Sequence, residues 1–339
     1  MAAEDNMKKP RLAVVGASGA VGRKVLDVIE VRDFPFTSID LLTSERSAGM
    51  WVSVRGERTQ YKKLTKESFD GVDIAIFDVP DEVSAEYVPF ARDAGCIAVD
   101  NSGAFRMYRN VPLVVPEINA YALKGHRGIV ANPNCTTAIT LMALAPLHDR
   151  FGIKQVKVTT FQAVSGAGQA GVDELERQVN EWKQGAELTT KAFPHPIFGN
   201  VIPQVGSFLP SGYTTEEEKL RREGAKILDL PELRISARCV RAPVFTAHSI
   251  DVMAVFEDRI TAAEARACLE QARGIDVIDD PDQSEYPMPL NATGKYNCKV
   301  GGIRKDCAFD NAISLFVSGD QLLKGAALNA VQIAELLIK

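Results

Sequence analysis

The sequence predicts a two-domain α/β protein, with a doubly wound parallel sheet first and an α+β domain second. Three observations support this fold class. A glycine-rich turn joins a short apolar strand to a helix near the start, apolar strands alternate with helices as far as residue 134, and a different mixture of strands and helices follows. The 339 residues are enough for two such domains, each with its own core.

The composition is that of an ordinary globular protein and argues against several functions. Apolar residues make up 46% and charged residues 24%, and the net charge of −5 gives no electrostatic case for nucleic acid. No apolar stretch approaches the ~20 residues of a membrane span. The polar first residues carry no secretory pattern and predict a short disordered tail on a cytoplasmic enzyme. The six cysteines form no CxxC pair, which predicts reduced thiols, no disulfide framework and no zinc site.

The first turn has the pattern of a dinucleotide-binding site. An apolar strand over residues 12–15 runs into Gly16, Gly19 and Gly22, and apolar residues at helical spacing follow. Backbone N–H groups and the helix dipole at such a turn bind a pyrophosphate, as in Rossmann-type domains. Glycines alone are weak evidence, because many tight turns carry two, but the strand–turn–helix context favours this interpretation.

The second strand indicates which dinucleotide binds. NAD sites usually end this strand with Asp or Glu, which holds the ribose 2′-hydroxyl. Here residues 36–44 lead into Thr43, Ser44, Arg46 and Ser47. Hydroxyls and a guanidinium suit a 2′-phosphate, so NADP is the expected cofactor; the alternative is a polar surface loop.

A reactive cysteine is expected at the ligand edge of this sheet. Strands over 72–79, 96–103 and 127–134, with a helix over 81–95, complete the alternating pattern. Cys135 follows the last of these strands and begins a helix over 135–151. A helix N-terminus is expected to lower the pKa of its thiol, which makes it a nucleophile. An ordinary buried thiol is the alternative, and it is the interpretation adopted for Cys96.

A cysteine nucleophile needs a proton carrier, and one of the four histidines is a candidate. His248 enters a strand of alternating polarity over residues 248–256. A single histidine on an apolar face is more often a core residue than a catalyst, so the position alone is weak evidence.

Seven motifs together make the sequence similar to one family. GASGAVG, TSERSAG, DNSGAFRM, NPNCTT, FQAVSGAG, CVRAPVFTAHS and KGAALNAVQIAE occur in this order over nearly the whole chain. They resemble aspartate-semialdehyde dehydrogenase. The resemblance implies a glyceraldehyde-3-phosphate-dehydrogenase-like fold: an NADP-binding Rossmann domain over 1–134 plus 315–339, and a catalytic and dimerisation domain over 135–314.

The activity implied by the resemblance is an NADPH-dependent reduction. L-Aspartyl 4-phosphate becomes L-aspartate 4-semialdehyde with release of phosphate, in the biosynthesis of lysine and diaminopimelate, methionine, threonine and isoleucine. Cys135 corresponds to the nucleophile that forms a thioester, His248 to the acid/base, and Gln162 to the glutamine that orients the substrate. This agrees with the chemistry of acyl transfer, which needs a thiolate and a proton carrier.

The resemblance also implies the substrate-binding residues. Arg106 and Asn134 correspond to phosphate-binding residues, and Arg241 to the arginine that holds the α-carboxylate. Glu216 corresponds to the residue that meets the substrate amine, and Lys219 lies near the phosphate. Without the resemblance, these charges would be assigned to a solvated surface.

The cofactor contacts and assembly follow in the same way. The expected contacts are Gly16, Ser18, Gly19, Ala20, Val21, Gly22, Thr43, Ser44, Arg46, Ser47, Ser165, Gly166 and Asn329. Two residues depart from the family pattern near this site, Glu45 and Asp78. A homodimer or a dimer of dimers is implied, and no metal.

The remaining elements complete the prediction. Strands are expected over 156–164, 238–244 and 248–256, helices over 171–182, 215–228 and 262–273, and an extended loop over 279–297. The sheet should be largely antiparallel. A helix over 319–339 is expected to pack back on the cofactor domain.

Two alternative functions stay open. N-Acetyl-glutamyl-phosphate reductase uses the same cysteine, histidine and dinucleotide, but its substrate has a blocked amine, so Glu216 argues against it. A non-catalytic Rossmann-type redox sensor with Cys135 as a reversible thiol would bind cofactor without turnover. It leaves Gln162, Arg241 and His248 unexplained.

Overall fold

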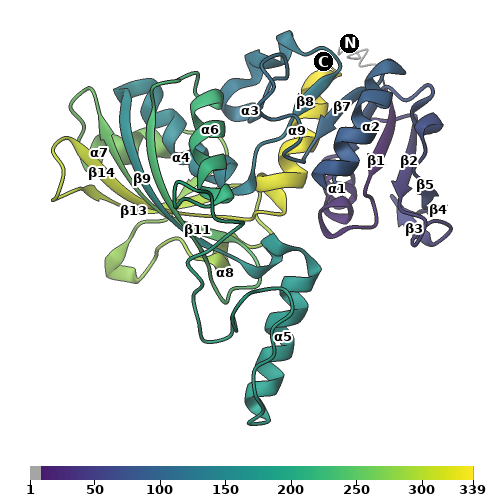
Figure 1. Cartoon of the computed structure of the whole chain (residues 1–339). Coiled ribbons are helices and arrows are strands. Elements are labelled where there is room, and N and C mark those ends of the chain that lie inside the picture. The colour runs from purple at the N-terminus through teal and green to yellow at the C-terminus, as the bar shows by residue number, and fades with distance from the viewer. Residues whose placement is uncertain (1–8, 339) are drawn as a thin grey trace. The chain divides into compact units, whose positions relative to one another are not determined.

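A computed structural model describes residues 9–338 and divides them into two compact units. The N-terminal tail expected from the sequence falls mainly on residues 1–8, outside the described residues. The first unit runs to Asn134 and resumes at Ala326, and the second spans Cys135–Gly325. Each unit is built on its own six-stranded sheet (Figure 1).

The first unit has a parallel sheet whose strand order reverses beside the glycine turn. Its strands are β1 (Arg11–Val15), β2 (Ser38–Thr43), β5 (Lys62–Lys63), β6 (Ile74–Phe77), β7 (Ile97–Asp100) and β8 (Ile129–Ala131). They lie in the order β5-β2-β1-β6-β7-β8, and every pairing is parallel. The chain goes outward from β1 in one direction and returns to β6 for the other. Ligands of such sheets bind at this switch point, beyond the carboxyl ends of the strands.

Three longer helices belong to the first unit. They are α1 (Ala20–Val31), α2 (Asp81–Asp93) and α9 (Leu328–Leu337). The C-terminal helix α9 contacts α1, β6 and β7, and Arg32 at the end of α1 forms a bidentate pair with Glu335 at 2.6 and 2.7 Å. The C-terminal helix therefore packs on the first unit, as the sequence predicted.

Smaller elements complete the first unit. They are the hairpin β3 (Trp51–Val54) and β4 (Glu57–Gln60), the helix α3 (Pro116–Asn119), and 3₁₀ turns at Lys66–Phe69 and Ala120–Gly125. The sequence analysis missed the hairpin, because its two strands have only four residues each and are mostly exposed.

The second unit has a mixed sheet. Its strands are β9 (Ile153–Gln162), β10 (Arg234–Arg241), β11 (His248–Phe256), β12 (Ile275–Val277), β13 (Cys298–Lys305) and β14 (Ala312–Gly319). The order is β10-β9-β11-β14-β13-β12; the inner pairings are antiparallel, while β10–β9 and β12–β13 at the edges are parallel. Strand β14 crosses the domain boundary expected at residue 314, and it pairs with β11 and β13 inside this sheet.

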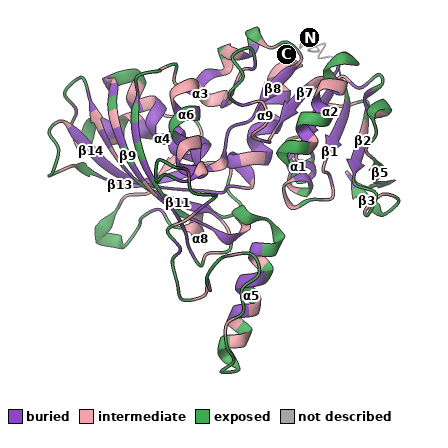
Figure 2. Ribbon diagram, in the orientation of Figure 1, coloured by how far each residue is buried: buried purple, intermediate pink, exposed green. Residues whose placement is uncertain are grey.

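Helices α4 (Cys135–Phe151), α6 (Thr215–Ile227) and α7 (Ala262–Glu270) pack on the second sheet. Every residue of α4 from Thr136 to Ala145 is buried, and most residues of β14, which it contacts, are buried as well (Figure 2). A helix that is apolar on all sides belongs in a core, so α4 is the central element of this unit.

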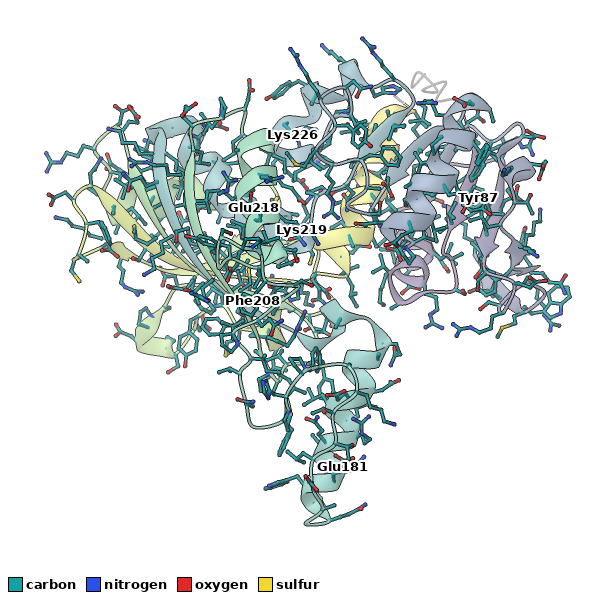
Figure 3. The ribbon with its side chains drawn as sticks, in the orientation of Figure 1. Tyr87, Glu181, Phe208, Glu218, Lys219 and Lys226 are labelled. Atoms are coloured by element: carbon teal, nitrogen blue, oxygen red, sulfur yellow. The ribbon has the colours of Figure 1, made fainter. Side chains whose placement is uncertain are left out.

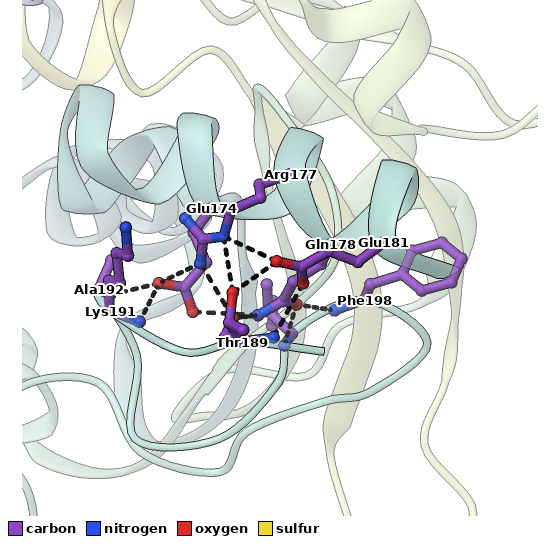
Figure 4. A network of polar contacts seen from close by, with 9 residues as sticks. Glu174, Arg177, Gln178, Glu181, Thr189, Lys191, Ala192 and Phe198 are labelled. Atoms are coloured by element: carbon purple, nitrogen blue, oxygen red, sulfur yellow. Dashed lines mark hydrogen bonds and ion pairs between the residues drawn. The ribbon is translucent and has the colours of Figure 1, made fainter. Parts of the chain in front are cut away.

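Helix α5 (Gln169–Lys183) extends away from the second sheet as an arm (Figure 1). Fully buried Glu174 accepts the N–H of Lys191 at 2.7 Å, which ties the returning chain to the helix (Figure 4). Gln178 accepts the N–H groups of Ile197 and Phe198 at 2.9 Å each. These bonds order a long return segment that has little regular secondary structure of its own.

Two expectations near the C-terminus need correction. The segment 279–297 is not wholly extended: it contains a 3₁₀ turn at Pro281–Gln283 and the short helix α8 (Pro289–Ala292). The α-helix expected from residue 319 begins only at Leu328, and a π-helical turn at Leu323–Ala327 precedes it. Within residues 9–338, no helix has the length and apolar character needed to cross a membrane.

Candidate active site

One edge of the second sheet gathers three of the predicted site residues. Strands β9 and β10 are parallel, with Arg241 opposite Gln162 in the register, so both strands end at the same edge. Strand β11 runs antiparallel to β9 and begins at this edge with His248. Helices α4 and α6 also begin there, since Cys135 and Glu216 both contact residues of this cluster.

The first contact of the site joins Cys135 to His248. The Cys135 sulfur lies 3.5 Å from Nε2 of the fully buried His248 ring. The backbone N–H of Ala163 donates to Nδ1 of the same ring at 3.0 Å. Because Nδ1 is an acceptor, the proton of the neutral imidazole resides on Nε2 and points at the sulfur.

The surroundings keep His248 neutral. Burial, with a smaller contribution from the positive charge of Arg241, lowers the pKa of His248 to about 3. In this geometry the ring acts toward the sulfur as a hydrogen-bond donor. To take a proton from the thiol, the ring would first have to lose the Ala163 bond and move its own proton to Nδ1.

The second contact joins Glu216 to Gln162. Gln162 Nε2 donates to Glu216 Oε1 at 3.1 Å, and the Thr136 hydroxyl donates to the same oxygen at 3.4 Å. The Thr160 hydroxyl donates to Gln162 Oε1 at 3.2 Å, which sets the orientation of the amide. Lys219 Nζ lies 3.6 Å from Glu216 Oε2, one turn along α6. A buried carboxylate and a half-exposed ammonium therefore pair within the first turns of α6.

The three consecutive glutamates of α6 have separate roles. Buried Glu217 closes a capping box with Thr214 and accepts the Cys239 N–H at 3.0 Å. Glu218, labelled on α6 in Figure 3, pairs with Arg221, whose hydrogen bond lowers the pKa of Glu218 to about 2. Among the three, Glu216 alone contacts Gln162.

Arg241 is held by the same backbone residue as His248. Its Nη1 donates to the Ala163 carbonyl at 2.6 Å, and burial lowers its pKa. A Cβ at Gly166 would lie 2.9 Å from this nitrogen and 3.0 Å from Cε1 of His248. Gly166 therefore borders both the Arg241 guanidinium and the His248 ring, and a side chain at this position would displace them.

Arg106 and Asn134 belong to the first unit. Arg106 is buried and donates to the carbonyls of Asn132 at 2.8 Å and Asn101 at 2.7 Å. Asn134 is also buried and directly precedes Cys135 in the chain. Arg106 thus fixes the strand end that leads into Asn134.

The glycine turn has the close packing that a dinucleotide site requires. Gly16 has a φ of +85°, and a Cβ there would lie 2.0 Å from the Asp78 carbonyl oxygen. A Cβ at Gly22 would lie 2.2 Å from the Gly16 carbonyl oxygen. Helix α1 has no side-chain cap at Gly19, and the Ser18 and Thr43 hydroxyls are 2.6 Å apart. The backbone of this turn can approach a phosphate because its three glycines carry no side chains of their own.

The loop after β2 carries the residues expected to select the cofactor. Ser44 and Arg46 are exposed and Ser47 is half-buried. Glu45, the family departure between them, forms an ion pair with Lys63 at 2.9 Å. Lys63 thus offsets the charge that would oppose a 2′-phosphate.

The other departure, Asp78, lies at the switch point. Burial raises the pKa of Asp78 to about 6, against the hydrogen bonds that it accepts from Asn101 and the Gly22 N–H. The Asp78 carboxylate therefore interacts with the N-terminus of α1, and the buried Asn101 Oδ1 beside it has no hydrogen-bond partner.

Asn329 lies in the interior of the first unit. It is fully buried, and its amide donates to the carbonyl of Val114 at 2.8 Å and to Asn132 Oδ1 at 2.5 Å. Its Oδ1 has no hydrogen-bond partner. Its role toward the nicotinamide stays a prediction.

Three residues of the site were missed by the sequence analysis. A Cβ at Gly325 would lie 2.6 Å from Cβ of Cys135, so this glycine leaves room for the nucleophile. Ala247, directly before His248, has a φ of +71°, and buried Gln321 accepts its N–H at 2.8 Å. The motif KGAA contains Gly325, but nothing local in the sequence indicates its contact.

Two other cysteines, Cys96 and Cys239, are buried thiols. Burial raises the pKa of Cys96 and of Cys239 to about 12, which agrees with the inert role expected for Cys96. Among residues 9–338, no group of three or more histidine, cysteine or acidic side chains could hold a metal ion.

Comparisons with known proteins agree with this geometry. Residues 11–126 match the family model "Semialdehyde dehydrogenase, NAD binding domain", and residues 144–324 match "Semialdehyde dehydrogenase, dimerisation domain". The fold and the site therefore define a two-domain semialdehyde dehydrogenase.

Individual relatives narrow the assignment. The chain is 46% identical to an aspartate-semialdehyde dehydrogenase of Aquifex aeolicus over 97% of this chain and 98% of the relative. It is 44% identical to that of Bacillus subtilis, over 97% of each. A crystal structure of aspartate semialdehyde dehydrogenase II from Vibrio cholerae, complexed with ASA, superposes with a TM-score of 0.95 at 39% identity over 98% of both chains. The chain belongs to the aspartate-semialdehyde dehydrogenase family.

Proposed function

We propose that this chain reduces L-aspartyl 4-phosphate to L-aspartate 4-semialdehyde with NADPH and releases phosphate. The observation that carries the proposal is the Cys135 sulfur 3.5 Å from a neutral, buried His248, beside Glu216 held by Gln162. An acyl phosphate requires a nucleophile at this position, and a substrate with a free amine requires a carboxylate near it.

The reaction begins with the Cys135 thiolate. Its sulfur forms a bond to the acyl carbon, the carbon–oxygen bond to phosphate breaks, and phosphate leaves with the electron pair, giving a thioester. The Nε2–H of His248 stabilises negative charge first on the sulfur and then on the acyl oxygen. When bound, NADPH would supply the hydride that converts the thioester to the aldehyde, and the Cys135 thiolate would be restored as the aldehyde leaves.

Opposite charges would orient the substrate. The Glu216 carboxylate accepts hydrogen bonds from the substrate ammonium, and the planar fork of Arg241 suits the α-carboxylate. Arg106, Asn134 and Lys219 supply donors for the phosphate. Gln162 keeps Glu216 in place, since its own amide is fixed by Thr160.

The residues of the first unit fit NADP. The glycine turn at Gly16, Gly19 and Gly22 suits the pyrophosphate, with Ser18, Ala20 and Val21 around it. Thr43, Ser44, Arg46 and Ser47 suit the 2′-phosphate, since Glu45 is paired with Lys63. Ser165, Gly166 and Asn329 are the further contacts that we propose.

Assembly and pathway extend the same proposal. The match to a dimerisation domain over residues 144–324 supports a homodimer formed through the second unit. A dimer of dimers is the larger assembly that we include in the proposal. The semialdehyde would supply the biosynthesis of lysine and diaminopimelate, methionine, threonine and isoleucine. The cytoplasmic location stays a prediction from the sequence.

The test is phosphate-dependent reduction of NADP with L-aspartate semialdehyde. The unmodified chain should turn over, Cys135→Ala should be inactive, and Cys307→Ala, which changes an exposed cysteine, should stay active. Turnover with the N-acetylated glutamate analogue instead would favour the blocked-amine reductase. Cofactor binding without turnover on either substrate would favour the redox sensor.

A further inference from the structure

The backbone immediately before His248 is in an unfavourable conformation. Ala247 is fully buried and has a φ of +71°, in the left-handed region that residues with a Cβ rarely adopt. This conformation directs the chain into β11 so that the His248 ring reaches Ala163 N–H and the Cys135 sulfur. Strained backbone of this kind persists only where neighbouring groups hold it.

Gln321 supplies that support. It follows the end of β14, and β14 pairs with the start of β11, with His248 opposite Gly319. Gln321 is 2% exposed, its Oε1 accepts the Ala247 N–H at 2.8 Å, and its Nε2 donates to the Ser165 hydroxyl at 2.6 Å. A single buried amide thus connects the residue before His248 with the turn after Ala163.

The turn at Ser165 is the other support of the ring. Ala163 holds Nδ1 of His248, and the next residues pair with the chain that approaches Ala247: Val164 N–H donates to the Val244 carbonyl at 2.8 Å. The Ser165 hydroxyl donates to the Phe245 carbonyl. Gln321 completes this arrangement by bonding to both segments.

We propose that Gln321 is a positioning residue for His248: it holds Ala247 in the left-handed conformation and Ser165 in its turn, and so keeps Nε2–H directed at the Cys135 sulfur. Gln321 acts through the backbone, because its hydrogen bonds are to the Ala247 N–H and the Ser165 hydroxyl. The proposal rests on Cys135 being the nucleophile of the proposed function, and it does not depend on which acyl phosphate is the substrate.

The test uses Gln321→Met, which keeps the side-chain volume and removes both hydrogen bonds. The readout is the rate at which iodoacetamide alkylates Cys135 in the full chain, followed on the Cys135 peptide by mass spectrometry across a range of pH. We expect alkylation about three to ten times slower at about pH 6, because the sulfur loses a directed donor. This readout needs no substrate, so it is independent of the substrate assignment.

Two further variants separate positioning from general destabilisation. Gln178→Met removes an equally buried glutamine that bonds to the backbone of Ile197 and Phe198 in the arm (Figure 4). It should lower the thermal midpoint and leave the alkylation profile unchanged. Ala247→Gly combined with Gln321→Met should restore the rate to within about twofold, because glycine adopts this φ without strain.

Three results would overturn the proposal. One is an alkylation profile of Gln321→Met that coincides with that of the unmodified chain. Another is a change confined to the Kd for NADPH, measured by cofactor fluorescence, which would make Gln321 a cofactor contact only. The third is a double variant as slow as Gln321→Met alone, which would show that the Ala247 backbone does not transmit the effect.

Discussion

Gly325→Ala tests how closely the backbone approaches the nucleophile. Gly325 lies in the π-helical turn Leu323–Ala327, against the first residue of α4. A methyl carbon at this position would lie 2.6 Å from Cβ and 3.1 Å from Cα of Cys135, whereas ordinary contact begins at 3.4 Å. One of the two segments must therefore move.

The size of the effect follows from these distances. Relieving the clash requires a displacement of about 1 Å, and misplacing a reacting group by that amount can cost about 10²-fold in rate. The first turn of α4 is fully buried after Cys135, so it resists movement and shares the strain. Overpacking of this kind costs about 1–3 kcal/mol of stability.

The assay compares kcat/KM for phosphate-dependent NADP reduction with the rate of Cys135 alkylation and the thermal midpoint. We expect kcat/KM to fall about 10²-fold, alkylation to change in parallel, and the chain to stay folded. Gly125→Ala is the matched control, because a methyl group there meets no atom within 4 Å. It should behave like the unmodified chain.

The reasoning fails if Gly325→Ala keeps kcat/KM within about threefold and alkylates at the unmodified rate, since the contact would then not constrain the sulfur. A loss of activity with an unchanged alkylation rate would also contradict it. In that case the substitution would act somewhere other than on Cys135.

Three further predictions follow from the charged groups. The pKa of Asp78 is raised to about 6, so its carboxyl group becomes negatively charged above that pH at the N-terminus of α1. NADPH binding should therefore weaken as pH rises. At about pH 8, Asp78→Asn should bind NADPH about five to ten times tighter than the unmodified chain, measured by fluorescence titration. Glu216→Gln should lower kcat/KM for the semialdehyde about 10²-fold, whereas Glu218→Gln should leave kcat/KM unchanged, because of these two glutamates only Glu216 contacts Gln162. Equal losses of kcat/KM in the two variants would contradict this prediction. In the folded chain His248 stays neutral because its pKa is about 3, whereas in the unfolded chain it binds a proton below pH ~6.5. The free energy of unfolding should therefore decrease as the pH is lowered. His248→Gln should remove up to about 2 kcal/mol of that decrease between about pH 7 and 5, measured by urea unfolding.

Local sequence patterns predicted several elements with good accuracy. The apolar run after Cys135 predicted the helix 135–151 and the alternation after His248 predicted the strand 248–256, and both have these bounds in the structure. Their periodicity is a local property, because one face or the whole surface of each element is buried. The hairpin at 51–60 has two four-residue strands that are mostly exposed, so it gave no burial pattern to detect.

Long-range pairing could not be predicted in the same way. Strand β14 lies across the boundary expected at residue 314, because its partners β11 and β13 are set by hydrogen bonds between distant segments. Strand β10 is parallel to β9, although most of the sheet is antiparallel as expected. The sequence patterns of parallel and antiparallel edge strands do not differ enough to separate these arrangements.

The sequence alone determined the class of fold, the glycine turn, the candidate nucleophile and the family, because each depends on residue types at fixed spacing along the chain. Only the tertiary structure decided how these residues work together. It brought Cys135, Gln162, Glu216 and His248 to one edge, and it assigned the proton of His248 to Nε2 through the Ala163 N–H. A hydrogen bond between residues 85 positions apart, or the space left by Gly325, depends on how the chain folds back on itself.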